Sequence, residues 1–148
     1  VKKLPGILAD LRRIKGRLLD ELSGTDGIVP IPSHDPDGDC GTTLGLEFPS
    51  EVEARRTAES VGAWLPIDSG KHVYSNWEPI LHHRGGHHPA LNPFNLPANQ
   101  GRNTDYSADM CPRTTDHLKR TVLISLHPDW DDARIDGILA ACKQSPAH

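Results

Sequence analysis

The chain has 148 residues, a net charge of −4, a hydrophobic content of 36% and a mean hydropathy of −0.50. This length predicts one domain with a modest core that depends on a partner surface for further burial, and the negative charge argues against a nucleic-acid partner. No apolar run is long enough to span a membrane, and three widely spaced cysteines (Cys40, Cys111 and Cys142) indicate a reducing compartment, so we expect a cytoplasmic protein.

Residues 1–24 are expected to form a leading helix, with its regular repeat from about residue 4 to residue 22. Apolar side chains recur three and four positions apart, at Leu4, Ile7, Leu11, Ile14 and Leu18. Pro5 is tolerated in a first turn, and Gly24 can end the helix. We interpret the apolar face as simple packing and the basic residues as its solvated side.

A strand is predicted over 43–48, because Leu44, Leu46 and Phe48 alternate with more polar residues. Three aspartates at alternate positions precede it (Asp35, Asp37 and Asp39), which raises the question of a calcium loop. The match is poor, because Leu46 stands where such a loop needs a bidentate glutamate. A turn rich in aspartate and glycine is the better interpretation.

A second helix is predicted to follow Ser50, which can cap it together with Glu53 three residues later. Its expected apolar face comprises Val52, Ala54, Ala58 and Val61, and Gly62 closes it. Residues 64–66 lead into a possible second strand, and residues 72–77 are a candidate for a third.

The segment 71–113 has little helical or strand periodicity after Leu81, yet it holds five of the nine histidines and both tyrosines. A loop of this length inside a compact domain is usually functional or disordered. We therefore expect the substrate-facing chemistry of the chain to lie here.

The last part of the chain returns to regular structure. A short helix is expected from Thr115 to Leu118, a strand from Thr121 to Leu126, and a final helix that begins at Asp129 and carries acids in its first turn. The last five residues, 144–148, are expected to be frayed. The whole order predicts an α+β fold, a small, mostly antiparallel sheet with helices on one face.

Several of these stretches together are similar to a known family. The strand GTTLGLEF, the helix that opens with PSEVEA and the closing block CPRTTDHLKRTVLISLHPDWDD resemble the C-terminal small domain of the DegT/DnrJ/EryC1/StrS family. These are fold-type I sugar aminotransferases that depend on pyridoxal 5'-phosphate. The segment Trp77 to His82 resembles the family's W-x-P-x-H segment, which borders the active-site mouth. The histidine falls one place late here, so His82 and His83 both remain candidates for that role.

The resemblance implies a division of labour. The family's Schiff-base lysine and phosphate-binding residues belong to a large domain that this sequence lacks, so pyridoxal 5'-phosphate would be held mainly by another domain or chain. Lys71 is the lysine nearest the polar segment, and nothing in the sequence places it in an imine-forming pocket. We expect no catalytic residue here and no activity of the chain alone. Its expected partners are a large domain or subunit and a keto-sugar that can be nucleotide-linked or acidic, within a homo- or hetero-oligomer.

The segment carries side chains suited to a sugar. Asparagine and histidine can hydrogen-bond hydroxyl groups, Trp77 and Phe94 offer flat apolar surfaces, and Arg113 is one of three arginines that can pair with an anion. The predicted substrate-binding residues are Asn76, Trp77, His82, His83, His87, His88, Asn92 and Arg113.

Two other interpretations remain open. Four neighbouring histidines (His82, His83, His87 and His88) could bind a metal, although Gly85 and Gly86 disfavour the helix that would align them and we expect no metal. Alternatively, the chain is a non-catalytic interaction subunit that docks through the broad apolar face of its leading helix. Deletion of residues 82–88 distinguishes the interaction subunit from the aminotransferase small domain. Activity of the assembled complex should survive the deletion in an interaction subunit and fail in a substrate-facing small domain.

Overall fold

The computed structural model describes residues 2–102 and 105–144, which fall into two compact units. The first unit comprises the chain up to Pro66 and again from Asp116 onward, and the second comprises Ile67–Thr115. The expected substrate-facing segment, 71–113, falls entirely within the second unit. The single-domain expectation stays a prediction.

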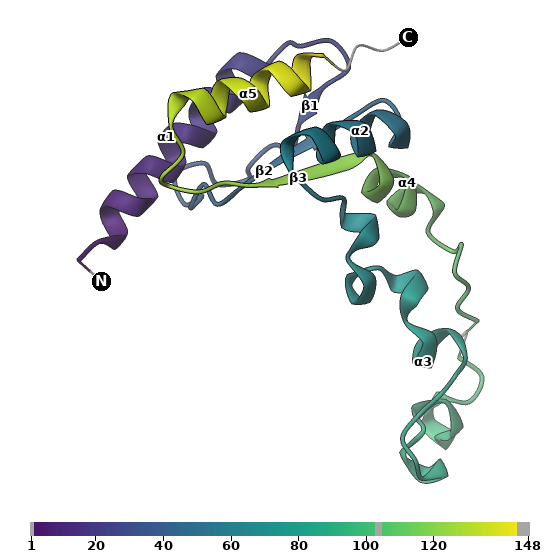
Figure 1. Cartoon of the computed structure of the whole chain (residues 1–148). Helices are drawn as coiled ribbons and strands as arrows, with labels where there is room; N and C mark the ends of the chain where they lie inside the picture. The colour runs from purple at the N-terminus through teal and green to yellow at the C-terminus, as the bar shows by residue number, and fades with distance from the viewer. Residues whose placement is uncertain (1, 103–104, 145–148) are drawn as a thin grey trace. The chain divides into compact units, whose positions relative to one another are not determined.

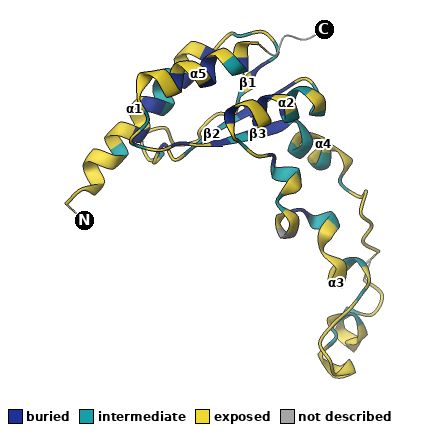
Figure 2. Ribbon diagram, viewed as in Figure 1, coloured by how far each residue is buried: buried dark blue, intermediate teal, exposed yellow. Residues whose placement is uncertain are grey.

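The leading helix is confirmed as α1 (Leu4–Leu22). Its buried residues are Leu11, Ile14, Leu18 and Leu22, which follow the predicted three- and four-residue spacing. The same stripe continues into the first two turns, but there Leu4 and Ile7 are 51% and 40% exposed. The apolar face is therefore longer than the surface that the first unit covers (Figure 2).

The sheet of the first unit has three antiparallel strands in the order β1 (Val29–Pro30), β2 (Thr43–Glu47) and β3 (Thr121–Ser125) (Figure 1). Leu44 pairs with Ile124 and Leu46 pairs with Val122, and all four side chains are buried. The alternation that predicted β2 thus places its leucines in the core. With five helices, this small antiparallel sheet confirms the predicted α+β class.

The second helix, α2 (Glu51–Val61), is capped as predicted. The Ser50 hydroxyl accepts a hydrogen bond from the Glu53 amide at 3.2 Å, and Gly62 follows with a φ of 72°. The predicted apolar face was wrong at Val52, which is 76% exposed, whereas Thr57 is buried. At 100° per residue, Val52 lies on the opposite side of the helix from Ala54, so both cannot face the core.

Neither additional strand forms as expected. Trp64 makes only an isolated bridge to Leu123, and residues 72–77 coil into short 3₁₀ turns at Gly70–His72 and Tyr74–Asn76. The turns use donors that a strand would need, since the Val73 amide donates to Gly70 and the Asn76 side chain donates to the same carbonyl at 2.9 Å. Local hydrogen bonding replaces sheet pairing here.

Two helices flank β3. α4 (Pro112–Arg120) is longer than the predicted short helix and starts with a proline, while the Thr115 hydroxyl donates to the Cys111 carbonyl at 3.2 Å instead of capping the helix. α5 (Asp132–Lys143) begins three residues later than expected, with Asp131 as its cap. Its buried face consists of Ile135, Ile138, Leu139 and Cys142. The expected fraying beyond Gln144 lies outside the described residues.

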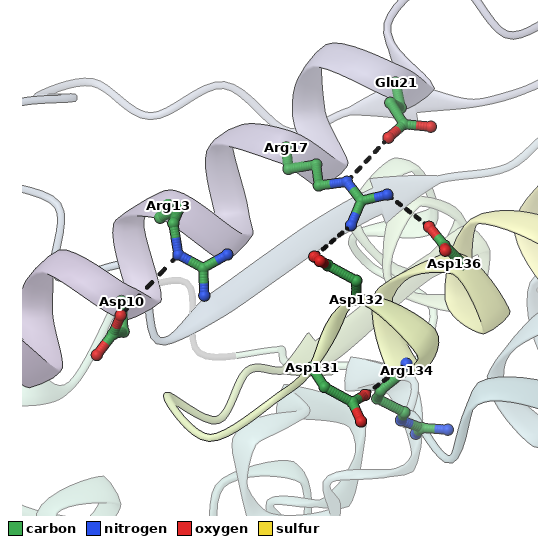
Figure 3. A network of polar contacts seen from close by, with 8 residues as sticks. All are labelled: Asp10, Arg13, Arg17, Glu21, Asp131, Asp132, Arg134 and Asp136. Atoms are coloured by element: carbon green, nitrogen blue, oxygen red, sulfur yellow. Dashed lines mark hydrogen bonds and ion pairs between the residues drawn. The ribbon is translucent and has the colours of Figure 1, made fainter.

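A polar clamp joins α1 to α5 (Figure 3). The Arg17 guanidinium donates to Asp132 at 2.8 Å and to Asp136 at 2.5 Å, and it also meets Glu21 on its own helix at 3.1 Å. By contrast, the ion pair of Arg13 among the described residues stays within α1, to Asp10 at 3.9 Å. Arg17 therefore fixes the alignment of two helices whose apolar faces meet beside it.

The aspartate-rich loop folds back onto α1. Gly41 has a φ of 72°, and a Cβ there would come within 2.9 Å of the carbonyl carbon of Leu11, so only glycine allows this approach. Lys15 donates to the Asp39 carboxylate at 2.5 Å, and the Gly41 amide donates to the same carboxylate at 2.7 Å. These two contacts hold the pKa of Asp39 below its ordinary value.

The second unit has little core of its own. Among its described residues only Val73 is buried. Besides the turns at Gly70–His72 and Tyr74–Asn76 and the first turn of α4, its regular structure includes α3 (Glu78–Leu81) and 3₁₀ turns at Pro89–Leu91, Pro93–Asn95 and Pro97–Asn99 (Figure 2). No helix within residues 2–102 and 105–144 combines the length and the apolar character that crossing a bilayer requires.

Candidate functional site

The second unit contains a cavity of about 400 Å³ whose lining is largely apolar. Two stretches of chain form its walls, the turn and helix from Tyr74 to Leu81 and the segment from Tyr106 to Thr114. The lining residues are Tyr74, Trp77, Ile80, Leu81, Tyr106, Met110, Cys111 and Thr114. A pocket of this size and character is typical of small-molecule sites.

Local helical geometry aligns one wall. Residues 74, 77, 80 and 81 lie three and four positions apart in consecutive helical turns, which brings their side chains to one side. The Tyr74 hydroxyl then ties the two walls together, because it donates to the Ala108 carbonyl at 2.8 Å and accepts from the Cys111 amide at 3.0 Å. The Tyr74 side chain is thus held in place by both walls, whereas the neighbouring Trp77 is 46% exposed.

A second cluster centres on His83 and Phe94. Their rings stack with centroids 4.5 Å apart, and the Phe94 and Tyr106 rings form a T-shaped pair with centroids 6.5 Å apart. Asn92 fixes both partners, since its side-chain amide donates to the His83 carbonyl at 2.9 Å and its side-chain oxygen accepts from the Phe94 amide at 3.0 Å. His83 has a φ of 51°, a left-handed backbone conformation that is uncommon for residues other than glycine.

The other predicted site residues lie apart from the cavity lining. The Nε2 atom of His82 lies 3.8 Å from the Oε2 atom of Glu78. His87 is exposed. The Nδ1 atom of His88 accepts a hydrogen bond from the Ala90 amide at 3.1 Å. Asn76 is exposed, and its amide is engaged with Gly70.

Arg113 is exposed in the first turn of α4. Of the eight predicted residues, Trp77 alone lines the 400 Å³ cavity, while His83 and Asn92 belong to the aromatic cluster. Substrate binding by the eight stays a prediction.

Sequence reasoning missed most of the cavity lining. Tyr74, Trp77 and Leu81 are spaced three and four residues apart, which is the one local signal of this wall, although Trp77 itself lies between the 3₁₀ turn Tyr74–Asn76 and α3. Met110 and Tyr106 carry no such signal, because the bond from the Tyr74 hydroxyl to the 108–111 backbone brings them there.

The histidines do not gather around a common point. Within the described part of the chain, no group of three or more His, Cys, Asp or Glu side chains is placed to hold a metal ion. The geometry gives the metal-binding interpretation no support, and the aspartate loop offers no calcium cage in these residues.

Pyridoxal phosphate fits the described residues poorly. An imine-forming lysine must have its amine available to the cofactor aldehyde, whereas Lys15, Lys119 and Lys143 are ion-paired with the carboxylates of Asp39, Glu51 and Glu21. No lysine or arginine lines the 400 Å³ cavity to cradle a phosphate. The side chain of Lys71 lies outside the described part of the chain. We therefore assign no step of cofactor chemistry to the described side chains.

No protein-family model and no curated protein matches the sequence. Among solved structures, the aminotransferase TlmJ from Streptoalloteichus hindustanus is similar in fold, with 15% sequence identity and a TM-score of 0.57. The alignment covers 97% of this chain and 33% of the other, so the chain spans about a third of the length of that aminotransferase. At this identity the likeness establishes a shared fold, that of a portion of an aminotransferase.

Proposed function

We propose that this chain is the small domain or subunit of a pyridoxal-phosphate-dependent aminotransferase acting on a keto-sugar. It shapes and closes the substrate site, while the cofactor lysine lies in a separate large domain or chain. The observation that carries the proposal is the fold likeness to an aminotransferase over 97% of the chain. The ion pairs of Lys15, Lys119 and Lys143 support a cofactor lysine in a second domain or chain.

The second unit supplies the expected substrate contacts. Trp77 offers a flat, half-exposed ring at the edge of the cavity, which suits the apolar face of a sugar ring. Hydrogen bonds to hydroxyl groups fall to the exposed side chains of Asn76, His82, His87 and His88. Arg113 would pair with an acidic group. His83 and Asn92 position the aromatic cluster that adjoins Tyr106.

A matched tryptophan pair tests the proposal in the intact enzyme or reconstituted complex. Trp77 and Trp64 are 46% and 45% exposed, but only Trp77 lines the cavity. We expect Trp77→Ala to raise KM for the keto-sugar about tenfold or more through lost ring contact, while Trp64→Ala leaves it within about twofold. Equal KM values for the two variants, or no transamination by the unaltered enzyme, would exclude the proposal.

The exposed start of α1 favours a second candidate, a non-catalytic interaction subunit. Leu4 and Ile7 extend the apolar stripe of the helix beyond its buried part, and such a surface is typical of a docking site. Under this candidate, deletion of residues 82–88 leaves the activity of the assembled complex intact. Under the keto-sugar proposal the same deletion abolishes activity without preventing assembly, which size-exclusion chromatography would establish.

A further inference from the structure

The first unit contains a second cavity, of about 320 Å³, that the proposed function does not use. It lies between α1 and the segment from Pro30 to Gly41, and its wall is mostly apolar. Leu19, Pro30, Ile31, Pro32 and Pro36 supply the apolar surface, and Arg12, Lys15, Ser33 and Asp39 supply the polar edge. Its volume falls at the lower end of the range, about 300–1,000 Å³, seen for small-molecule pockets.

A glycine in the middle of α1 keeps this cavity open. Gly16 lines the cavity, and a Cβ built on it would meet no atom within 4 Å. Glycine inside a helix weakens that helix relative to alanine, so packing does not explain its presence here. A larger side chain at this position would instead extend into the space between Leu19 and the prolines.

The polar edge carries excess positive charge. Two cations, Arg12 and Lys15, face one carboxylate, that of Asp39, which Lys15 already neutralises at 2.5 Å. The Arg12 guanidinium is oriented by two backbone acceptors, with Nε donating to the Asp39 carbonyl at 2.7 Å and Nη2 donating to the Asp37 carbonyl at 2.9 Å. Its Nη1 atom has no other partner among the described residues and is available to an anion.

We propose that this cavity binds a small aromatic carboxylate, with its ring against the proline and isoleucine wall over Gly16 and its carboxylate on Arg12. A flat ring suits an apolar slot of this size. A carboxylate matches the Nη1 side of the Arg12 guanidinium, which makes no hydrogen bond to the described residues. This site goes beyond the proposed transamination and does not depend on it.

The test is titration of the full chain with phenylacetate, followed by amide NMR shifts. A ligand of this size is expected to bind with a Kd on the order of 1 mM. We expect saturable shifts centred on Gly16, Ile31 and Gly41. Acetate, which lacks the ring, should give no saturable shift, and neutral phenylacetamide should bind about tenfold more weakly because a charged hydrogen bond is lost.

Matched variants on α1 locate the site. Gly16→Leu fills the cavity and should weaken phenylacetate binding at least tenfold, whereas Gly6→Leu, at another open helical glycine outside the cavity, should leave it unchanged. Gly16→Ala adds a single methyl group and serves if the leucine variant misfolds. Shifts that centre elsewhere, binding that survives Gly16→Leu, or no saturation at tens of millimolar would each overturn the proposal.

Discussion

Thr57 shows how one buried atom affects stability. Its side chain is buried in α2, and within the described residues its hydroxyl has no hydrogen-bond partner. A buried polar group without a partner costs about 1–3 kcal/mol. We predict that Thr57→Val raises the free energy of unfolding by about 1 kcal/mol, measured by urea denaturation, because valine keeps the shape and removes the unpaired hydroxyl.

Thr121 is the matched control for that substitution. It is also buried, but its hydroxyl donates to the His117 carbonyl at 2.7 Å. Thr121→Val should therefore lower the free energy of unfolding by about 1 kcal/mol. If both variants were destabilised equally, the Thr57 hydroxyl would have a partner that the structure does not show.

Asp39 is expected to make stability pH-dependent in the acid range. The hydrogen bonds from Lys15 and from the Gly41 amide favour its charged form, so its pKa lies below the ordinary value of 3.8. A lowered pKa contributes stability that is present above the unfolded value and is lost as the pH falls through the folded value. In Asp39→Asn, the free energy of unfolding should therefore fall less steeply with decreasing pH below about pH 4.

Unfolding midpoints measured from neutral to acid pH would check this. Asp37→Asn is the control, because among the described residues Asp37 meets Arg12 through its backbone carbonyl, which this substitution keeps. The Asp37 variant should keep the acid slope of the unaltered chain. Identical slopes for both variants would contradict the role given to Asp39.

At the scale of elements, Arg17 links α1 to α5. Because it reaches Asp132 and Asp136 across the helix pair, Arg17→Gln should lower the thermal midpoint more than Arg13→Gln, which affects only a contact within α1 (Figure 3). All these groups are partly exposed, so the effect should be small and should shrink in about 1 M salt. Equal midpoints at low salt would show that the clamp adds nothing.

The elements that the sequence predicted well are those with local signals. α1 has a complete three- and four-residue repeat, α2 has a serine cap and a closing glycine, and β2 alternates leucines over five residues. The expected strand at 72–77 failed because its amides bond locally: the Asn76 side-chain amide and the Val73 backbone amide donate to the Gly70 carbonyl, and the Trp77 backbone amide donates to Tyr74. Such competition between side chain and backbone cannot be resolved from residue type alone.

The candidate site was less predictable than the fold. Trp77 was identified by its residue type, and it does line the cavity. Met110 and Tyr106 could not be identified, because they reach the cavity through the contacts of the Tyr74 hydroxyl with backbone more than 30 residues away. Residue polarity instead favoured His82, His83, His87 and His88 as site residues, and most of these make contacts with residues nearby in the sequence.

At the scale of the whole molecule, the two units differ in how much they bury. The first unit has a continuous core over α1, α2, α5 and the sheet, whereas Val73 is the single buried residue among those described in 67–115. We predict faster amide hydrogen exchange throughout 67–115 than in β2 and β3, because few apolar contacts oppose local opening. Comparable protection in both units would imply that the second unit is covered in solution, for example by self-association.

We expect the cofactor lysine to lie outside this chain. Lys15, Lys119 and Lys143 are each ion-paired with a carboxylate of this chain, and none of the three lines the 400 Å³ cavity. We expect that pyridoxal phosphate followed by borohydride labels no single lysine of this chain to completion. Peptide mapping by mass spectrometry would measure the label at every lysine, including Lys71.

The control is the same treatment of the intact enzyme or of a reconstituted complex with its large partner. There, one lysine should be labelled stoichiometrically, and its peptide should come from outside these 148 residues. If instead one lysine of this chain were fully labelled, the chain would carry its own imine-forming group. The division of labour between a substrate-shaping small domain and a cofactor-holding partner would then be wrong, even though the shared aminotransferase fold would stand.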